Sequence, residues 1–227
     1  MYLNTSDSNP TVHVYTQIIQ TGTPGLIDLE SDIREWRRLS TENNIPFFAF
    51  TIVREPVSFA KSYFNFFYIR CIFQWCETGD DGRRYNLMRA RKKDFFRHLV
   101  PNRQCFFLRH ASAVNGMKHH VYDDCPATTQ GCKEVYDSMT ENLDWVGITE
   151  NLSQDTMPML SFILTGSTDL AETISPQNKA SEENLEYTLT DVNHEKARRY
   201  LKEDQKIYEN VVQDFPSSMW QNLSLGR

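Results

Sequence analysis

The first thing this sequence lacks is the phosphate-binding loop of nucleoside triphosphatases. None of its nine glycines begins the pattern Gly-x-x-x-x-Gly-Lys-Ser/Thr, and the first lysine in the chain is Lys61. That pattern surrounds the phosphates of a nucleotide with backbone N–H groups and a lysine. Its absence argues against a kinase or another nucleoside triphosphatase.

Long apolar runs and excess positive charge are missing as well. No stretch approaches the roughly 18 consecutive apolar residues of a membrane span. Residues 1–7 lack the basic start and apolar core of a signal peptide. We therefore expect no anchor or secretion signal within the printed residues. The net charge of −6 argues against general nucleic-acid binding.

Cysteine is sparse but present. The five cysteines fit either a reducing or an oxidising compartment, and their odd number leaves at least one thiol unpaired. Cys125 and Cys132 flank a polar loop that is well placed for a disulfide. Asn4, Asn151 and Asn222 each begin an Asn-x-Ser/Thr sequence, an acceptor for glycosylation if the chain enters the secretory pathway.

What the chain contains is typical of one α/β domain spanning residues 1–227. Its 40% hydrophobic content suffices for one sizeable core. The apolar patterns predict a strand over 12–19, a helix over 29–39 and a strand over 46–53, which together form a β-α-β unit. Further helices are predicted over 152–164 and 192–212, with an irregular segment over 111–130 and a polar connection over 166–184.

The most informative stretch is the junction at the end of the strand over 46–53. An apolar run without helical spacing ends at Arg54, and Pro56 suits the first turn of a helix. In an open parallel sheet such a junction lies at the carboxyl edge, where ligands bind. Free N–H groups and the positive end of a helix favour an anion there. Arg54 is therefore placed where a phosphate would dock.

The helix predicted after Pro56 has two distinct faces. Ser58, Ser62 and Asn65 follow the spacing of one helical face and could bond a ligand. The adjoining stripe is aromatic and suits packing against the core; it consists of Phe59, Tyr63, Phe66 and Phe67.

The junction contains Arg54-Glu55-Pro56, and Ser62 follows eight positions after the arginine. This pattern resembles the 3′-phosphate-binding element of sulfotransferases that use 3′-phosphoadenosine 5′-phosphosulfate (PAPS). The resemblance implies that Arg54 makes a bidentate charge-assisted contact to the 3′-phosphate and that the Ser62 hydroxyl bonds another of its oxygens. The alternative is a strand-end arginine that caps a neighbouring helix or pairs with a carboxylate.

Three later segments extend this resemblance over about residues 45–215. Residues 144–152 resemble the late Val-Gly-x-Thr-Glu strand of the family, and residues 204–215 resemble its closing helix, an acidic residue followed by an aromatic stripe. Asn102-x-Gln104-x-x-x-Leu108 is similar to a segment of Golgi carbohydrate sulfotransferases of the uronyl 2-O and galactose 3-O types. The resemblance implies a three-layer fold like that of P-loop nucleoside triphosphatases, with a central parallel sheet.

The implied activity is transfer of a sulfuryl group from PAPS to a carbohydrate hydroxyl, without a metal, in the Golgi lumen. Family members also carry an earlier strand-loop-helix whose lysine grips the 5′-phosphosulfate, and no lysine precedes Lys61. We expect this first unit, and with it a single-pass membrane anchor, to lie upstream of the printed residues. The alternative is a non-catalytic descendant that binds a nucleotide or a glycan.

Two further residues are candidates for the chemistry. His13 is the candidate base for the acceptor hydroxyl, because histidine titrates near pH ~6.5 and related enzymes place a histidine in a similar segment; the alternative is a structural histidine. Lys179 is a candidate contact to the cofactor, or else a solvated loop lysine. His119 and His120 are adjacent and point different ways, so no metal site is predicted. Glu150 is expected to cap a helix, the alternative being contact with the acceptor sugar.

Basic residues concentrate in one segment that contains a single acid, Asp94. A helix with one buried side is predicted over 85–99 and leaves its basic residues outward. Arg89, Lys92 and Lys93 are the candidate contacts to an anionic glycan, the alternative being a solvated face. The whole basic set is Arg83, Arg84, Arg89, Arg91, Lys92, Lys93, Arg97 and Arg103.

Overall fold

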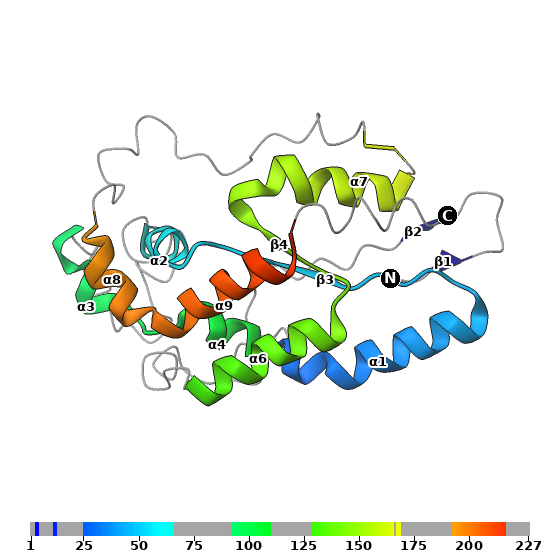
Figure 1. Cartoon of the computed structure of the whole chain (residues 1–227), viewed down its shortest axis with the longest axis horizontal. Coiled ribbons are helices and arrows are strands. Elements are labelled where there is room, and N and C mark those ends of the chain that lie inside the picture. Colours follow the sequence, from blue (N-terminus) through cyan, green and yellow to red (C-terminus); the bar gives the residue numbers. More distant parts are fainter. Residues whose placement is uncertain are drawn as a thin grey trace, which may run out of the picture.

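The computed structural model describes residues 3–4, 11–12, 25–65, 92–109, 129–165, 167–168 and 192–216. This part of the chain is an α/β structure, mostly helical, around a small two-stranded parallel sheet (Figure 1).

The parallel sheet consists of β3 (Phe50–Val53) and β4 (Trp145–Ile148). The two strands are in register, so that their first residues pair with each other and so do their last. Both strands therefore end at the same edge, and the residues that follow them meet there. The parallel pairing is as predicted, although β3 is shorter than the expected strand over 46–53.

The expected first strand over 12–19 does not join this sheet within the described residues. Thr11–Val12 forms β2, which pairs in antiparallel fashion with β1 (Leu3–Asn4). Residues 13–19 lie outside the described part. The prediction of a β-α-β unit that begins with this strand is therefore not confirmed, because Val12 pairs with β1 instead of β3.

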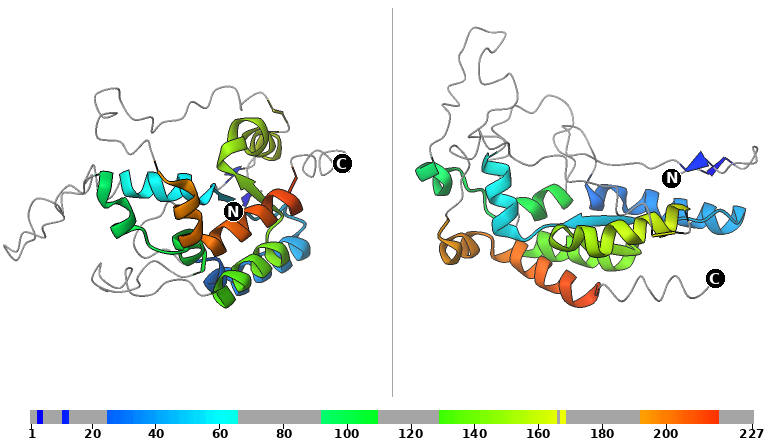
Figure 2. Two further views of the ribbon diagram at one scale, coloured as in Figure 1. Left: turned by 60° about the vertical axis from the view of Figure 1, so that its left-hand side comes forward. Right: turned by 90° about the horizontal axis from the view of Figure 1, so that it is seen from above.

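Helices lie on both sides of the strand pair (Figures 1 and 2). On one side is α7, and on the other are α1, α4, α6 and α9. Among the described residues, α2, α3 and α8 gather near the carboxyl edge of the strands. The bounds are α1 (Leu26–Asn43), α2 (Pro56–Phe64), α3 (Phe95–His98), α4 (Arg103–Arg109), α6 (Thr129–Asn142), α7 (Met157–Thr165), α8 (His194–Tyr200) and α9 (Lys202–Asp214).

Helix α1 confirms and extends the helix predicted over 29–39. Its last turn closes at Asn44, whose left-handed φ of 51° lets the N–H of the next residue, Ile45, reach the carbonyl of Ser40 at 2.9 Å. From α1, the Arg37 guanidinium donates to both carboxylate oxygens of Asp144, at 2.8 and 3.0 Å. Asp144 Oδ2 also accepts from the N–H of Ala49 at 2.8 Å. This carboxylate thereby joins α1 to the residues that precede both parallel strands.

Three other predicted helices differ from expectation. The helix over 192–212 is divided at the buried Leu201, whose φ of −105° and ψ of 28° separate α8 from α9. The helix over 152–164 begins as a π-helical turn (Leu152–Thr156) before α7. Of the basic helix over 85–99, the described part is a 3₁₀ turn (Lys92–Asp94) followed by α3.

Two apolar clusters form the core, and the Arg54 junction connects them. One cluster contains Val53 at the end of β3, and the other contains Val57 near the start of α2. The first also includes Cys105, Cys132, Val135, Met139, Val146, Ile207 and Val211; the second also includes Ala60, Phe64, Phe95, Ala197 and Leu201. Because both clusters exclude water, the backbone between Val53 and Val57 is fixed at each end.

The disulfide prediction was wrong. Cys132 bonds to Cys105, with a Cα–Cα distance of 5.5 Å, and not to Cys125, which lies outside the described residues. The reason is tertiary packing: α4 and α6 lie against each other, and this contact brings together two buried cysteines that are 27 positions apart.

Candidate functional site: the carboxyl edge of β3 and β4

Arg54 follows β3 directly, and α2 begins two residues later with Pro56 in its first position, as predicted. The N-cap of α2 is Glu55, whose Oε2 accepts from the N–H of Ser58 at 2.7 Å. The expectation of free N–H groups for an external anion is therefore wrong at Ser58, because the chain's own carboxylate already occupies this helix end. Since Pro56 has no N–H and that of Ser58 is taken, any phosphate at this junction would depend mainly on side chains.

The backbone of Arg54 is held by a single side chain. The N–H of Arg54 donates to Gln104 Oε1 at 2.8 Å, and Gln104 Nε2 donates to the carbonyl of Arg54 at 3.0 Å. One residue earlier, the carbonyl of Val53 accepts from Thr149 Oγ1 at 3.1 Å. The backbone at the end of β3 is thus fixed by groups from α4 and from the turn after β4.

The guanidinium of Arg54, in contrast, has an unsatisfied donor. Its Nε is buried and has no hydrogen-bond partner, and Arg54 forms no ion pair with any residue of the described part. Within those residues, the alternative of an arginine paired with a carboxylate is therefore not seen. A buried donor without a partner costs about 1–3 kcal/mol. A cationic donor of this kind at a sheet edge fits an anionic ligand.

Ser62 lies on α2 with its side chain exposed. The opposite, packed side of α2 contains the buried Val57, Ala60 and Phe64. The rings of Phe59 and Tyr63 lie 6.3 and 5.9 Å from that of Phe107 on α4.

Phe59 and Tyr63 thus pack as predicted for the aromatic stripe, whereas Phe66 and Phe67 lie outside the described residues. Ser62 stays accessible, although no interaction joins it to Arg54 in the structure.

A second carboxylate lies at the same edge. Glu150, two residues after β4, accepts from the N–H of Glu55 through Oε1 at 3.2 Å and from the Tyr208 hydroxyl through Oε2 at 3.5 Å. Burial, followed by the charges of Glu150 and Glu55, raises the pKa of Tyr208. The Glu150 carboxylate therefore supports the backbone at the N-terminus of α2, in keeping with the capping role that the sequence favoured.

The turn that carries Gln104 is fixed by a reciprocal pair of caps. Asp204 Oδ2 accepts from the N–H of Gln104 at 3.1 Å, and Oδ1 accepts from the N–H of Cys105 at 2.7 Å. In return, Asn102 Oδ1 accepts from the N–H groups of Glu203 and Asp204 at 3.0 and 3.3 Å. Burial raises the pKa of Asp204 to about 7, although the two backbone bonds act in the opposite direction.

Sequence reasoning singled out the segments of Gln104 and Asp204 but assigned neither residue a role. The contacts of these residues join positions 50 and 100 apart, which no local pattern reveals. Tyr208 was overlooked for the same reason. The neighbouring residues gave no signal either, because Asp204 stands between Glu203 and Gln205 and Gln104 follows Arg103.

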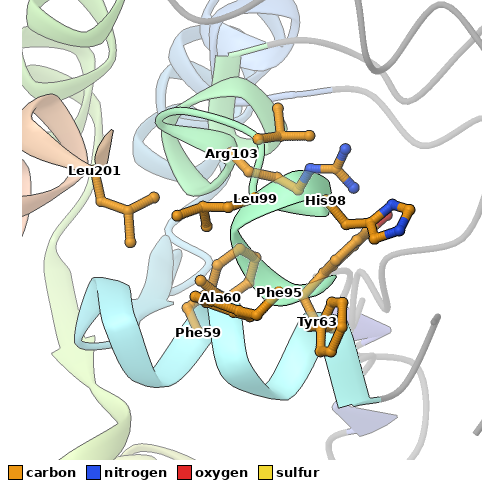
Figure 3. A pocket seen from close by; sticks show the side chains of 10 residues that line it. Phe59, Ala60, Tyr63, Phe95, His98, Leu99, Arg103 and Leu201 are labelled. Carbon is orange, nitrogen blue, oxygen red and sulfur yellow. The ribbon is translucent and has the colours of Figure 1, made fainter. Parts of the chain in front are cut away.

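A small hollow lies between α2, α3 and the start of α4 (Figure 3). Its walls are mainly apolar, from Phe59, Tyr63, Phe95 and Leu99, and its free volume of about 10 Å³ suits one water molecule. The Arg103 guanidinium lies 4.2 Å from the centroid of the Tyr63 ring. Arg103, a member of the basic set, is therefore buried, and this hollow is too small for a nucleotide.

The remaining sequence candidates are not brought to this edge by the described residues. Lys93 is exposed on the 3₁₀ turn before α3; Lys92 begins that turn, and the position of its side chain is not described. His13, Arg89 and Lys179 lie outside the described residues.

Within the described residues, no group of three or more histidine, cysteine, aspartate or glutamate side chains is arranged to hold a metal ion. None of the described helices combines the length and apolar character that crossing a membrane requires.

A scan against protein-family models finds no match for the chain, and searches of curated proteins and of solved structures find no significant match either. The functional argument therefore depends on the residues at the carboxyl edge and on their geometry.

Proposed function

We propose that this protein is a sulfotransferase that moves a sulfuryl group from PAPS to a hydroxyl of a carbohydrate. The observation that carries the proposal is the guanidinium of Arg54, at the carboxyl edge of β3, with a buried Nε that has no hydrogen-bond partner. An arginine presents two parallel donors that match a phosphate group. Arg54 and the exposed Ser62 are the proposed ligands of the 3′-phosphate.

The fold supports this assignment in outline. Two parallel strands with helices on both sides are compatible with a three-layer domain, and Arg54 lies at the edge where open parallel sheets bind ligands. The buried Cys105–Cys132 disulfide fits an oxidising compartment, such as the proposed Golgi lumen.

In the proposed reaction, the acceptor hydroxyl oxygen forms a bond to sulfur while the bond between sulfur and the phosphate oxygen breaks. The hydroxyl proton passes to a base, for which His13 is the proposed residue, and the products are the sulfated sugar and 3′-phosphoadenosine 5′-phosphate (PAP). Catalysis of this kind depends on positioning and on charge stabilisation. Arg54 contributes by fixing the nucleotide end of the donor, Lys179 is a further proposed contact to it, and the basic residues Arg89, Lys92 and Lys93 are proposed for an anionic acceptor.

A second candidate is a binding module that holds the nucleotide or a glycan without transfer. It needs only the Arg54 junction, with its unpartnered buried Nε, and no catalytic base. Binding of PAP without transfer from PAPS to any carbohydrate would favour this second candidate.

The test is isothermal titration of the folded chain with PAP and, separately, with adenosine 5′-monophosphate, which lacks the 3′-phosphate. We expect saturable binding of PAP at least about tenfold tighter than that of the monophosphate, since hydrogen bonds to charged groups contribute about 1.5–3 kcal/mol. Equal affinities, or no binding by a chain that circular dichroism shows to be folded, would contradict the proposal.

A further inference from the structure

The side-chain amide of Gln104 forms an unusual two-point contact with a single backbone residue. It accepts from the N–H of Arg54 at 2.8 Å and donates to the carbonyl of Arg54 at 3.0 Å. Two hydrogen bonds exchanged in this way reproduce the pattern by which one residue of an antiparallel strand holds its partner. Because both bonds go to one residue, they restrict φ and ψ of Arg54 together.

Gln104 is itself held in place from two directions. Its own N–H donates to Asp204 of α9, and the next residue, Cys105, is joined by a disulfide to Cys132 of α6. Only 6% of Gln104 is exposed. The amide that holds Arg54 is therefore part of the core and does not belong to a mobile surface loop.

The orientation of Arg54 depends on this contact. Arg54 lies between β3 and the N-cap of α2, where neither strand nor helix hydrogen bonds fix its backbone. A change in its backbone angles swings the whole side chain, because the rotamers begin at the Cα–Cβ bond. A bidentate contact to a phosphate requires the guanidinium to be placed within about 0.5 Å.

We infer that Gln104 is a positioning residue for Arg54: its amide sets the Arg54 backbone so that the guanidinium meets the 3′-phosphate of a nucleotide. The inference rests on the proposed function, and it adds a determinant of ligand selectivity that touches the ligand only through Arg54.

The test compares the affinities for PAP and for adenosine 5′-monophosphate across a double-mutant cycle of Gln104→Met and Arg54→Ala. In Gln104→Met, we expect the affinity for PAP to fall about tenfold, the loss of roughly one charge-assisted contact. The affinity for the monophosphate should stay within about twofold, and Gln104→Met should have no further effect on PAP affinity when Arg54 is already alanine. The control is Gln130→Met, which changes an exposed glutamine on α6 that bonds only Glu134 and is expected to leave both affinities unchanged.

Gln104→Glu provides a second variant of nearly the same shape. Its carboxylate can still accept from the N–H of Arg54 but cannot donate to the carbonyl, so the preference for PAP should fall here too. Retained preference in the folded Gln104 variants, or equal losses with and without Arg54, would overturn the positioning role while leaving the Arg54 site intact. A wild-type chain with no preference for PAP would instead overturn the proposed function, and this inference with it.

Discussion

Two helix N-termini in this protein use their polar groups differently. At the start of α4, the Asp204 carboxylate accepts from two N–H groups, and Asn102 returns two bonds to α9. At the start of α2, Glu55 caps its own helix, but the neighbouring Arg54 keeps a buried Nε without a partner. At the first junction the backbone N–H groups of Gln104 and Cys105 are satisfied by a side chain from α9, although Nη2 of the buried Arg103 has no hydrogen-bond partner. At the second, the unpartnered Nε belongs to a cation at the carboxyl edge of the parallel strands.

In the proposed function, this difference separates structural from ligand-binding polar groups. Changes at the α4 junction and in the core beneath the edge should lower the free energy of unfolding. Loss of the Arg54 guanidinium should weaken ligand binding without lowering the free energy of unfolding.

The largest expected loss of stability follows removal of the disulfide that holds α4 to α6. The Cys105→Ala/Cys132→Ala variant frees a loop that spans 27 positions, so the free energy of unfolding should fall by about 3.5 kcal/mol on a chain-entropy estimate. Guanidinium denaturation measures this loss. The Cys125→Ala variant distinguishes the Cys105–Cys132 bond from the Cys125–Cys132 bond that the sequence suggested, since it leaves the first intact. A loss of stability of the same size in Cys125→Ala would contradict the structure.

The next largest loss of stability is expected in β4, the strand that leads to Glu150. A Cβ on Gly147 would lie 2.4 Å from Thr156 Oγ1, and Thr156 is a fully buried β-branched residue with little freedom to move. Gly147→Ala should therefore lower the free energy of unfolding by about 2 kcal/mol. Thermal unfolding checks this value. The Gly147→Ala/Thr156→Ala double variant, which lacks both Thr156 Oγ1 and Cγ2, should show a smaller loss than the sum of the two single variants, and an additive loss would show that the crowding has another source.

The buried carboxyl of Asp204 should make the stability of the fold depend on pH. Its pKa is raised to about 7 by burial, whereas an unfolded aspartate titrates near ~3.9. Between these pH values the folded chain retains a proton that the unfolded chain has lost. The free energy of unfolding that this group contributes therefore falls as pH rises from about 4 to 7, and it no longer changes above that range. The slope reaches at most about 1.4 kcal/mol per pH unit.

The measurement is urea denaturation at several pH values between about 5 and 8, with Asp204→Asn as the comparison. The asparagine variant cannot titrate and should lose this part of the slope. Identical pH profiles for the two proteins would show that the carboxyl of Asp204 titrates in its ordinary range.

The smallest expected loss of stability is at Arg54. Arg54→Met removes a buried donor that has no partner, so the free energy of unfolding should stay the same or rise, by up to about 1–3 kcal/mol. The matched control is Arg37→Met, which breaks a two-point pair with Asp144 that is partly exposed and should cost about 1 kcal/mol. A larger loss at Arg54 than at Arg37 would mean that Arg54 is structural.

The sequence predicted what depends on neighbouring residues. Proline chemistry predicted the start of α2 at Pro56. Hydrophobic spacing predicted the strand that ends before Arg54 and a helix within α1. The packing of Phe59 and Tyr63 on α2 follows from the same periodicity.

What the sequence could not predict depends on tertiary packing. The pairing of Cys132 with Cys105, the contact of Gln104 with Arg54 and the caps between α4 and α9 all join distant positions. The Glu55 cap could have been foreseen, because a carboxylate beside the first turn competes with an external anion for the same N–H groups. The π-helical turn before α7 has no local signal that we recognise.

The most direct test of the central claim is the affinity of the Arg54→Ala variant for PAP, compared with wild type by isothermal titration. Adenosine 5′-monophosphate serves as the ligand that lacks the 3′-phosphate. We predict that the substitution weakens PAP binding by about tenfold or more, the value of a charge-assisted hydrogen bond, and leaves binding of the monophosphate unchanged. Unchanged PAP affinity in a folded variant would contradict the assignment of Arg54 to the 3′-phosphate.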